Sequence, residues 1–126
     1  MIDDETVDES YRLIETTAIP GVRTVRLYEE TWEHIAEQHP EFQNRIPALK
    51  HAVLDTISNP TLVCASRTQP ATSVVFASSN NLKGGTHMLS VPVRIVAGTV
   101  SGRVTTAMFA SPPKGEVLFE KGGDDD

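Results

Sequence analysis

The stretch HMLSVPVRIVA, residues 87–97, decides the fold that the sequence predicts. Apolar side chains recur at every second position, which is typical of a strand with one buried face. Because proline cannot donate a ladder hydrogen bond, an edge or a bulge is expected at Pro92. The alternation directs one set of side chains toward the core, namely Leu89, Val91, Val93 and Ile95, and leaves Met88, Ser90, Pro92 and Arg94 on the opposite face.

Similar strand-like stretches surround this one. They are GVRTVRLY (21–28), TLVCASR (61–67), SVVFAS (73–78), GRVTTAMFA (102–110) and, as a further candidate, GEVLFE (115–120). Short segments rich in turn-forming residues separate the later strands, and they are too short for helical crossovers. The sequence therefore predicts an antiparallel sheet.

Two helices are expected between the first strand and the others. In the first, Trp32, Ile35 and Ala36 fall on one stripe, and the helix should end at His39, because the residue before a proline avoids helical geometry. The second carries an apolar face and ends at Asn59–Pro60; its apolar residues are Ile46, Leu49, Val53, Leu54 and Ile57. The expected fold is α+β, with two N-terminal helices packed on one face of a four- to five-stranded antiparallel sheet.

The chain of 126 residues has the length of one domain, with 39% apolar residues to form its core. We assign residues 1–20 to an acidic arm that is flexible or loosely docked, 21–120 to a single domain, and 121–126 to a disordered acidic tail. The acidic start, MIDDETVDES, does not resemble a signal peptide, and no apolar run is long enough to span a bilayer, so we expect a cytoplasmic protein. The single cysteine, Cys64, lies in an apolar run and is expected to be buried.

Charge is distributed unevenly along the chain. The formal net charge is −6, but eight of the seventeen acids lie in residues 3–9 and 124–126, and all eleven Lys and Arg lie between them. Residues 10–123 therefore carry about +2, and no acid occurs between Asp55 and Glu116. This balance favours an anionic ligand such as a phosphate-bearing molecule, although scattered, solvated cations are an equally good interpretation.

Two histidines, His34 and His39, lie five residues apart in WEHIAEQHPEF (32–42). On a continuous helix they would point about 140° apart, so the spacing does not form a metal motif. If the chain turns at Pro40, the two rings could approach each other, and imidazoles suit general acid–base chemistry near neutral pH. The alternative is structural: His34 as a partly buried helix residue and His39 as a C-terminal cap.

Arginines in the strand region are the candidate phosphate ligands. Arg67, Arg94 and Arg103 each offer a planar fork of donors that matches phosphate oxygens, although each could instead be a solvated surface charge. Aromatic residues make up only 6% of the chain, and none was found to alternate with basic residues. A stacking platform for single-stranded nucleic acid is therefore not predicted.

The order of these parts resembles the phage-associated branch of the ribonuclease superfamily that groups barnase, EndoU, the nuclease colicins and RelE toxins. The similarity rests on WEHIAEQHPEF, ISNPTLV (57–63) and VTTAMFA (104–110), and covers about residues 22–112. It implies metal-independent RNA cleavage, in which the ribose 2′-hydroxyl attacks the adjacent phosphate, and it implies no cofactor. His34, His39 and Thr106 match the catalytic pattern, Arg67 or Arg94 would stabilise the phosphate charge, and Arg94 and Arg103 would bind substrate phosphates.

The resemblance also implies a toxin-like or phage-derived nuclease that needs restraint. An antitoxin or immunity protein could mask the cationic face, or the acidic arm could do so, in which case its removal should raise activity. Two other functions stay open. One is a non-enzymatic α+β protein-binding module, a toxin partner or a phage accessory protein; the other is a metal-dependent hydrolase that uses His34, Glu37 and His39.

Overall fold

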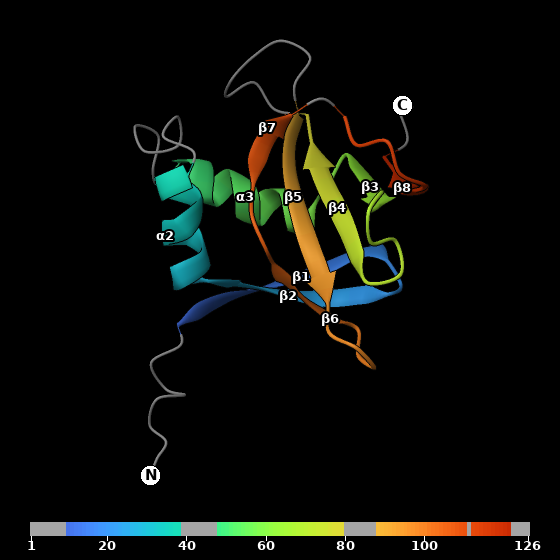
Figure 1. The fold of residues 1–126 in the computed structure, drawn as a ribbon, viewed down its shortest axis with the longest axis horizontal. Helices are drawn as coiled ribbons and strands as arrows, with labels where there is room; N and C mark the ends of the chain where they lie inside the picture. The colour runs from blue at the N-terminus through green and yellow to red at the C-terminus, as the bar shows by residue number, and fades with distance from the viewer. Residues whose placement is uncertain (1–9, 39–47, 80–87, 111, 122–126) are drawn as a thin grey trace.

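The computed structural model describes residues 10–38, 48–79, 88–110 and 112–121. The described elements are β1 (Tyr11–Ile19), β2 (Val22–Tyr28), α2 (Glu29–Gln38), α3 (Ala48–Ser58), β3 (Leu62–Ala65), β4 (Ser73–Ser78), β5 (Met88–Ile95), β6 (Ser101–Val104), β7 (Met108–Ala110) and β8 (Val117–Glu120). Figure 1 shows β4 and β5 at the centre, with α2 to one side and α3 behind them.

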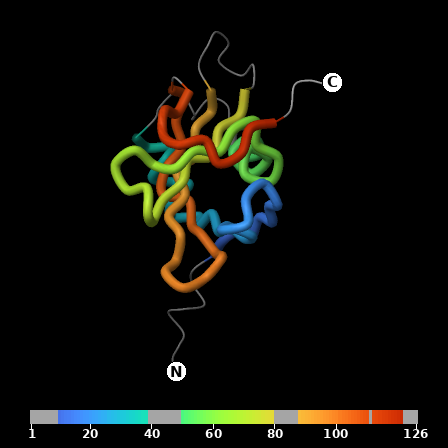
Figure 2. Tube along the Cα trace, turned by 90° about the vertical axis from the view of Figure 1, so that its right-hand side faces the viewer, coloured from blue at the N-terminus to red at the C-terminus, as the bar shows by residue number. Residues whose placement is uncertain are grey.

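The strands form one curled, mixed sheet. Its order is β1-β2-β6-β5-β4-β3-β8, and β7 pairs with β5 beyond the end of β6. β2 and β6 are parallel, whereas the other pairs are antiparallel. The outer strands β1 and β8 approach each other, so the sheet forms a half-barrel. Helix α3 contacts β1, β4 and β5 and covers the open side, between the blue and red ends of the trace in Figure 2.

The predicted fold class is wrong. The sheet has eight strands and one parallel pair, both helices follow the first two strands, and α2 packs beside β2 rather than next to α3 on a single sheet face. Residues 11–19, assigned to the acidic arm, form β1 along β2. Charged and polar side chains of β1 obscured the short alternation that buries Ile14 and Thr16, and an irregularity in the pairing with β2 shifts the next buried residue to Ile19.

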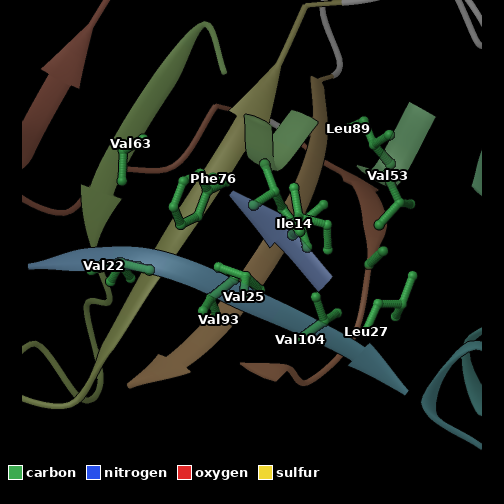
Figure 3. Packing of buried hydrophobic residues seen from close by; sticks show 14 of the residues in the cluster. Ile14, Val22, Val25, Leu27, Val53, Val63, Phe76, Leu89, Val93 and Val104 are labelled. Carbon is green, nitrogen blue, oxygen red and sulfur yellow. The ribbon is translucent and has the colours of Figure 1, made fainter. Parts of the chain in front are cut away.

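A continuous apolar core fills the concave side of the sheet (Figure 3). Leu89, Val91 and Val93, predicted to face the core, are fully buried, and Ile95 is partly buried. Met88 and Ser90, predicted on the opposite face, are buried as well, so the predicted contrast between the two faces is wrong at the start of β5. Two residues of α3, Val53 and Ile57, are fully buried as well, as the predicted apolar face requires. The core therefore lies between α3 and the inner face of the sheet. The opposite face is covered at Cys64, Ala77, Met88 and Ser90, which are buried, and is exposed at Arg94.

Pro92 lies in an interior strand, where no edge is present. Its carbonyl oxygen accepts hydrogen bonds from the backbone nitrogen of Thr105, at 3.1 Å, and from the Thr105 hydroxyl, at 3.3 Å. Pro92 therefore faces the interruption between β6 and β7, where the neighbouring strand leaves the ladder. The missing donor is tolerated because the irregularity lies in the neighbouring strand.

Helix α2 begins with an ion pair that connects it to α3. Lys50 Nζ lies 2.8 Å from a Glu29 carboxylate oxygen, and the glutamates of the first turn interact favourably with the helix dipole. Trp32 and Ile35 are buried, as the predicted stripe requires. One face of α2 is thereby held against the core while its other face remains exposed.

Cys64 is fully buried in β3, as expected, and its burial raises the pKa of the thiol, with a smaller contribution from Glu120. Among the described residues, no helix combines the length and the apolar character needed to cross a membrane.

We expect Gly115→Ala to destabilise the fold by about 1–3 kcal/mol, because the added Cβ would lie directly against the Ala65 carbonyl oxygen in neighbouring β3. Gly21→Ala is the matched control: nothing lies within 4 Å of its added Cβ, and its effect should stay within about 0.5 kcal/mol. Urea denaturation measures both free energies of unfolding. Equal stabilities of the two variants would contradict the described approach of residue 115 to β3.

Candidate functional site

Three arginines lie side by side across the outer face of the sheet. In the strand register, Arg26 of β2 is opposite Arg103 of β6, and Arg103 is opposite Arg94 of β5. Adjacent strands are about 4.8 Å apart, so these residues, here called the arginine row, extend over roughly 10 Å. All three are exposed, whereas Val25 and Val93, which precede Arg26 and Arg94, are buried on the core side.

Like charges on directly opposite residues destabilise a sheet, so a row of three cations is unfavourable for folding alone. Within the described part of the chain, none of the three arginines forms an ion pair with a carboxylate. The row therefore presents positive charge that no ion pair among the described residues neutralises and that an anionic ligand would; Glu30, Glu33 and Glu37, which line a hollow with Arg103, offset part of it.

Two tyrosines, here called the tyrosine pair, adjoin the arginine row. Tyr11 of β1 is opposite Tyr28 of β2, and their ring centroids are 5.2 Å apart. The Arg26 guanidinium carbon lies 4.8 Å from the Tyr11 centroid, and that of Arg103 lies 5.1 Å from the Tyr28 centroid. These cation–π contacts hold two of the guanidinium groups in place and partly offset their mutual repulsion.

Arg26 also donates a long hydrogen bond of 3.5 Å from Nη1 to the Tyr28 hydroxyl. This bond, together with the charges that Tyr11 and Tyr28 would carry on ionisation, raises the pKa of Arg26. Arg26 therefore stays cationic at any pH at which the protein is folded.

A groove runs from the arginine row to the exposed face of α2. One hollow of about 580 Å³ contains Arg94 and Arg103, and a second of about 510 Å³ contains Arg103 and His34. Both are also lined by Thr31 and Thr105, so they adjoin each other, and we call them together the α2 groove. Arg103 is the residue that joins the row to His34.

Carboxylates flank His34 on α2. Glu30, His34 and Glu37 are spaced four and three residues apart, which places them on one face of the helix, and Glu33 also lines the hollow. His34 is exposed, so its imidazole is accessible from solvent. An imidazole, a carboxylate and a guanidinium at one hollow can donate a proton, accept a proton and stabilise an anion without further groups.

The remaining candidates from the sequence lie elsewhere. Thr106 is half-buried and does not line the α2 groove, whereas its neighbour Thr105 does. Arg67 is exposed in the loop after β3 and lines none of the described hollows. His39 lies outside the described residues. The structure thus brings together His34, Arg94 and Arg103, and separates Arg67 and Thr106 from them.

The metal-binding alternative depended on His34, Glu37 and His39. In the part of the chain that the structure describes, no three His, Cys, Asp or Glu side chains are grouped closely enough to hold an ion, and His39 falls outside that part.

Sequence reasoning missed Arg26 and the tyrosine pair. A signal was present, because Arg26 and Tyr28 are two residues apart in one strand and so share its outer face. Tyr11 could not be found this way, since its strand was not predicted.

In comparisons with known proteins, no protein-family model, no curated protein and no solved structure matches the chain.

Proposed function

We propose that the protein is a metal-independent endoribonuclease that binds the RNA backbone along the arginine row and cleaves it in the α2 groove. The proposal rests on one observation. Three arginines are aligned across the sheet, none of them in an ion pair among the described residues, and one of the three, Arg103, also lines a hollow with His34 and glutamates. A row of roughly 10 Å is long enough to contact two or three adjacent phosphates.

In the proposed reaction, a glutamate of α2 removes the proton of the ribose 2′-hydroxyl. The resulting oxygen attacks the adjacent phosphorus, and the bond from phosphorus to the 5′-oxygen breaks. His34 donates a proton to that leaving oxygen, which yields a 2′,3′-cyclic phosphate and a free 5′-hydroxyl. Arg103 stabilises the additional negative charge on the phosphate in the transition state.

A toxin-like or phage-derived role in the cytoplasm, with an antitoxin or immunity protein as partner, belongs to the same proposal. The unpaired charge of the arginine row supports it, because an acidic partner could cover that row and exclude RNA.

We predict that the purified chain cleaves single-stranded RNA in the presence of EDTA and leaves 2′,3′-cyclic phosphate ends. His34→Ala should lower the rate by about 10²- to 10⁴-fold, the range for loss of one proton-transfer group. His51→Ala is the matched control, because His51 is an exposed histidine on α3 that does not line the α2 groove. Glu30→Gln, Glu33→Gln and Glu37→Gln, assayed one at a time, identify the base.

Intact RNA with the wild-type protein would reject the enzyme and favour the protein-binding module. Cleavage that EDTA abolishes would favour the metal-dependent hydrolase, and equal losses in the two histidine variants would remove His34 from the mechanism.

The arginine row should determine how strongly binding depends on salt. For a 2′-O-methyl RNA oligonucleotide, which cannot be cleaved by this route, Arg26→Gln, Arg94→Gln and Arg103→Gln should each reduce the slope of log K against log salt by about 0.7. Arg12→Gln is the control, since Arg12 is opposite the buried Leu27 and lines a hollow beside α3 instead. Unchanged slopes in all three row variants would show that phosphates bind elsewhere, and Arg67→Gln would then test the loop after β3.

The acidic N-terminal segment is expected to compete with RNA. Ser10 lines a hollow together with Arg103, and Glu5, Asp8 and Glu9 precede Ser10 in the sequence. Neutralising those three as Gln, Asn and Gln should raise RNA affinity roughly threefold or more at low salt, and the gain should vanish at high salt.

The charge-matched control neutralises Asp124, Asp125 and Asp126, which come after β8 in the sequence; no residue of β8 lines a described hollow of the arginine row. Fluorescence anisotropy with the 2′-O-methyl oligonucleotide measures both variants. Equal gains would show a general effect of net charge and contradict competition at the arginine row.

A further inference from the structure

We infer that the tyrosine pair and the hollow beside it bind an unpaired nucleobase, so that the substrate is single-stranded. This inference rests on the proposed function, which identifies the ligand as RNA. It adds a contact to the base, whereas the arginine row contacts only phosphates.

Rings and guanidinium groups form a continuous layer on the outer face of β1, β2 and β6. Arg103 contacts the ring of Tyr28, Tyr28 contacts Tyr11, and Tyr11 contacts Arg26. Tyr11 is 42% exposed, which leaves part of its ring open to solvent. Nucleobases stack on aromatic rings and on guanidinium planes, so each member of this layer is a suitable surface for a base.

A hollow of about 240 Å³ adjoins the layer, lined by Arg26, Tyr28 and Arg103 and by the hairpin that joins β5 to β6. The hairpin contributes an apolar side chain, Val96, and the hydroxyl-bearing residues Thr99 and Ser101. The hollow thus combines an aromatic wall with cations that would hold the phosphate. Its hydroxyls are already engaged: Thr99 Oγ1 donates to the Val96 carbonyl oxygen and accepts from the Ser101 backbone nitrogen, and Ser101 Oγ is hydrogen-bonded to Thr24 Oγ1, so they offer a base edge only their remaining hydrogen-bonding capacity.

The position of the tyrosine pair requires a single strand. The pair lies beside the arginine row, two residues further along β2, because Tyr28 is opposite Tyr11 whereas Arg26 is opposite Leu13 and Arg103; a nucleotide whose phosphate binds Arg26 or Arg103 therefore has its base beside Tyr28. In a duplex the faces of that base are covered by its stacked neighbours, and an exposed ring cannot contact them without unstacking.

The test measures binding without cleavage, so that it does not depend on catalysis. Wild-type protein is titrated by fluorescence anisotropy with three probes of equal charge per strand: a 2′-O-methyl oligouridine, the same oligonucleotide with central abasic sites, and the base-bearing strand paired with its complement. Variants are Tyr28→Leu, which removes the ring, and Tyr28→Phe, which keeps it. Tyr11→Leu is a second variant on β1 in case Tyr28→Leu fails to fold, and thermal unfolding monitors folding.

We expect Tyr28→Leu to weaken binding of the base-bearing strand by about 5- to 100-fold, with little change for the abasic strand, and Tyr28→Phe to bind within about twofold of wild type. The duplex should bind more weakly than the single strand. Equal wild-type affinity for base-bearing and abasic strands, or equal losses for both in the leucine variants, would overturn the inference and leave only phosphate contacts. If base-dependent binding is found but RNA is not cleaved, the inference stands and the proposed enzyme fails.

Discussion

The parallel pairing of β2 with β6 is the constraint on which the rest of the structure depends. It joins residues 24–26 to residues 101–103, so the chain between them must return to the end of the sheet at which β2 starts. That returning chain contributes both described helices and strands β3, β4 and β5. β1 pairs with the outer side of β2, and β5 pairs with the outer side of β6. The sheet curls across these four strands, and α3 covers the open side of the curl.

The same pairing separates the two faces of the sheet. Inward-facing residues such as Val25, Leu27 and Val104 are buried from water, and this burial is the main favourable contribution to folding. Since neighbouring side chains on a strand point in opposite directions, an inward Val25 and Leu27 require an outward Arg26. The arginine row therefore results from a register that the core selects, because a slip of one residue would place arginines in the interior.

A fold could satisfy that register with neutral outward residues, so the presence of arginine at all three positions requires another reason. The contacts from Arg26 and Arg103 to the tyrosine pair reduce the repulsion without neutralising the charge. This arrangement differs from a surface ion-pair network, in which charges cancel and no anion is attracted. It agrees with a surface whose charge is kept available, and His34 at the adjoining groove adds a group that can transfer protons.

Local features were predictable from the sequence alone. The alternation over residues 87–97 indicated that Leu89, Val91 and Val93 face the core, and the stripe of Trp32 and Ile35 indicated the buried side of α2. Each of these depends on residues close together in the chain. Tertiary structure decided the rest. It made residues 11–19 a strand, placed β2 parallel to β6, and so brought Arg26 and Arg103 next to each other and to the tyrosine pair. Periodicity specifies which face of a strand is buried but not which strand lies beside it, because that choice depends on how distant apolar faces pack into one core.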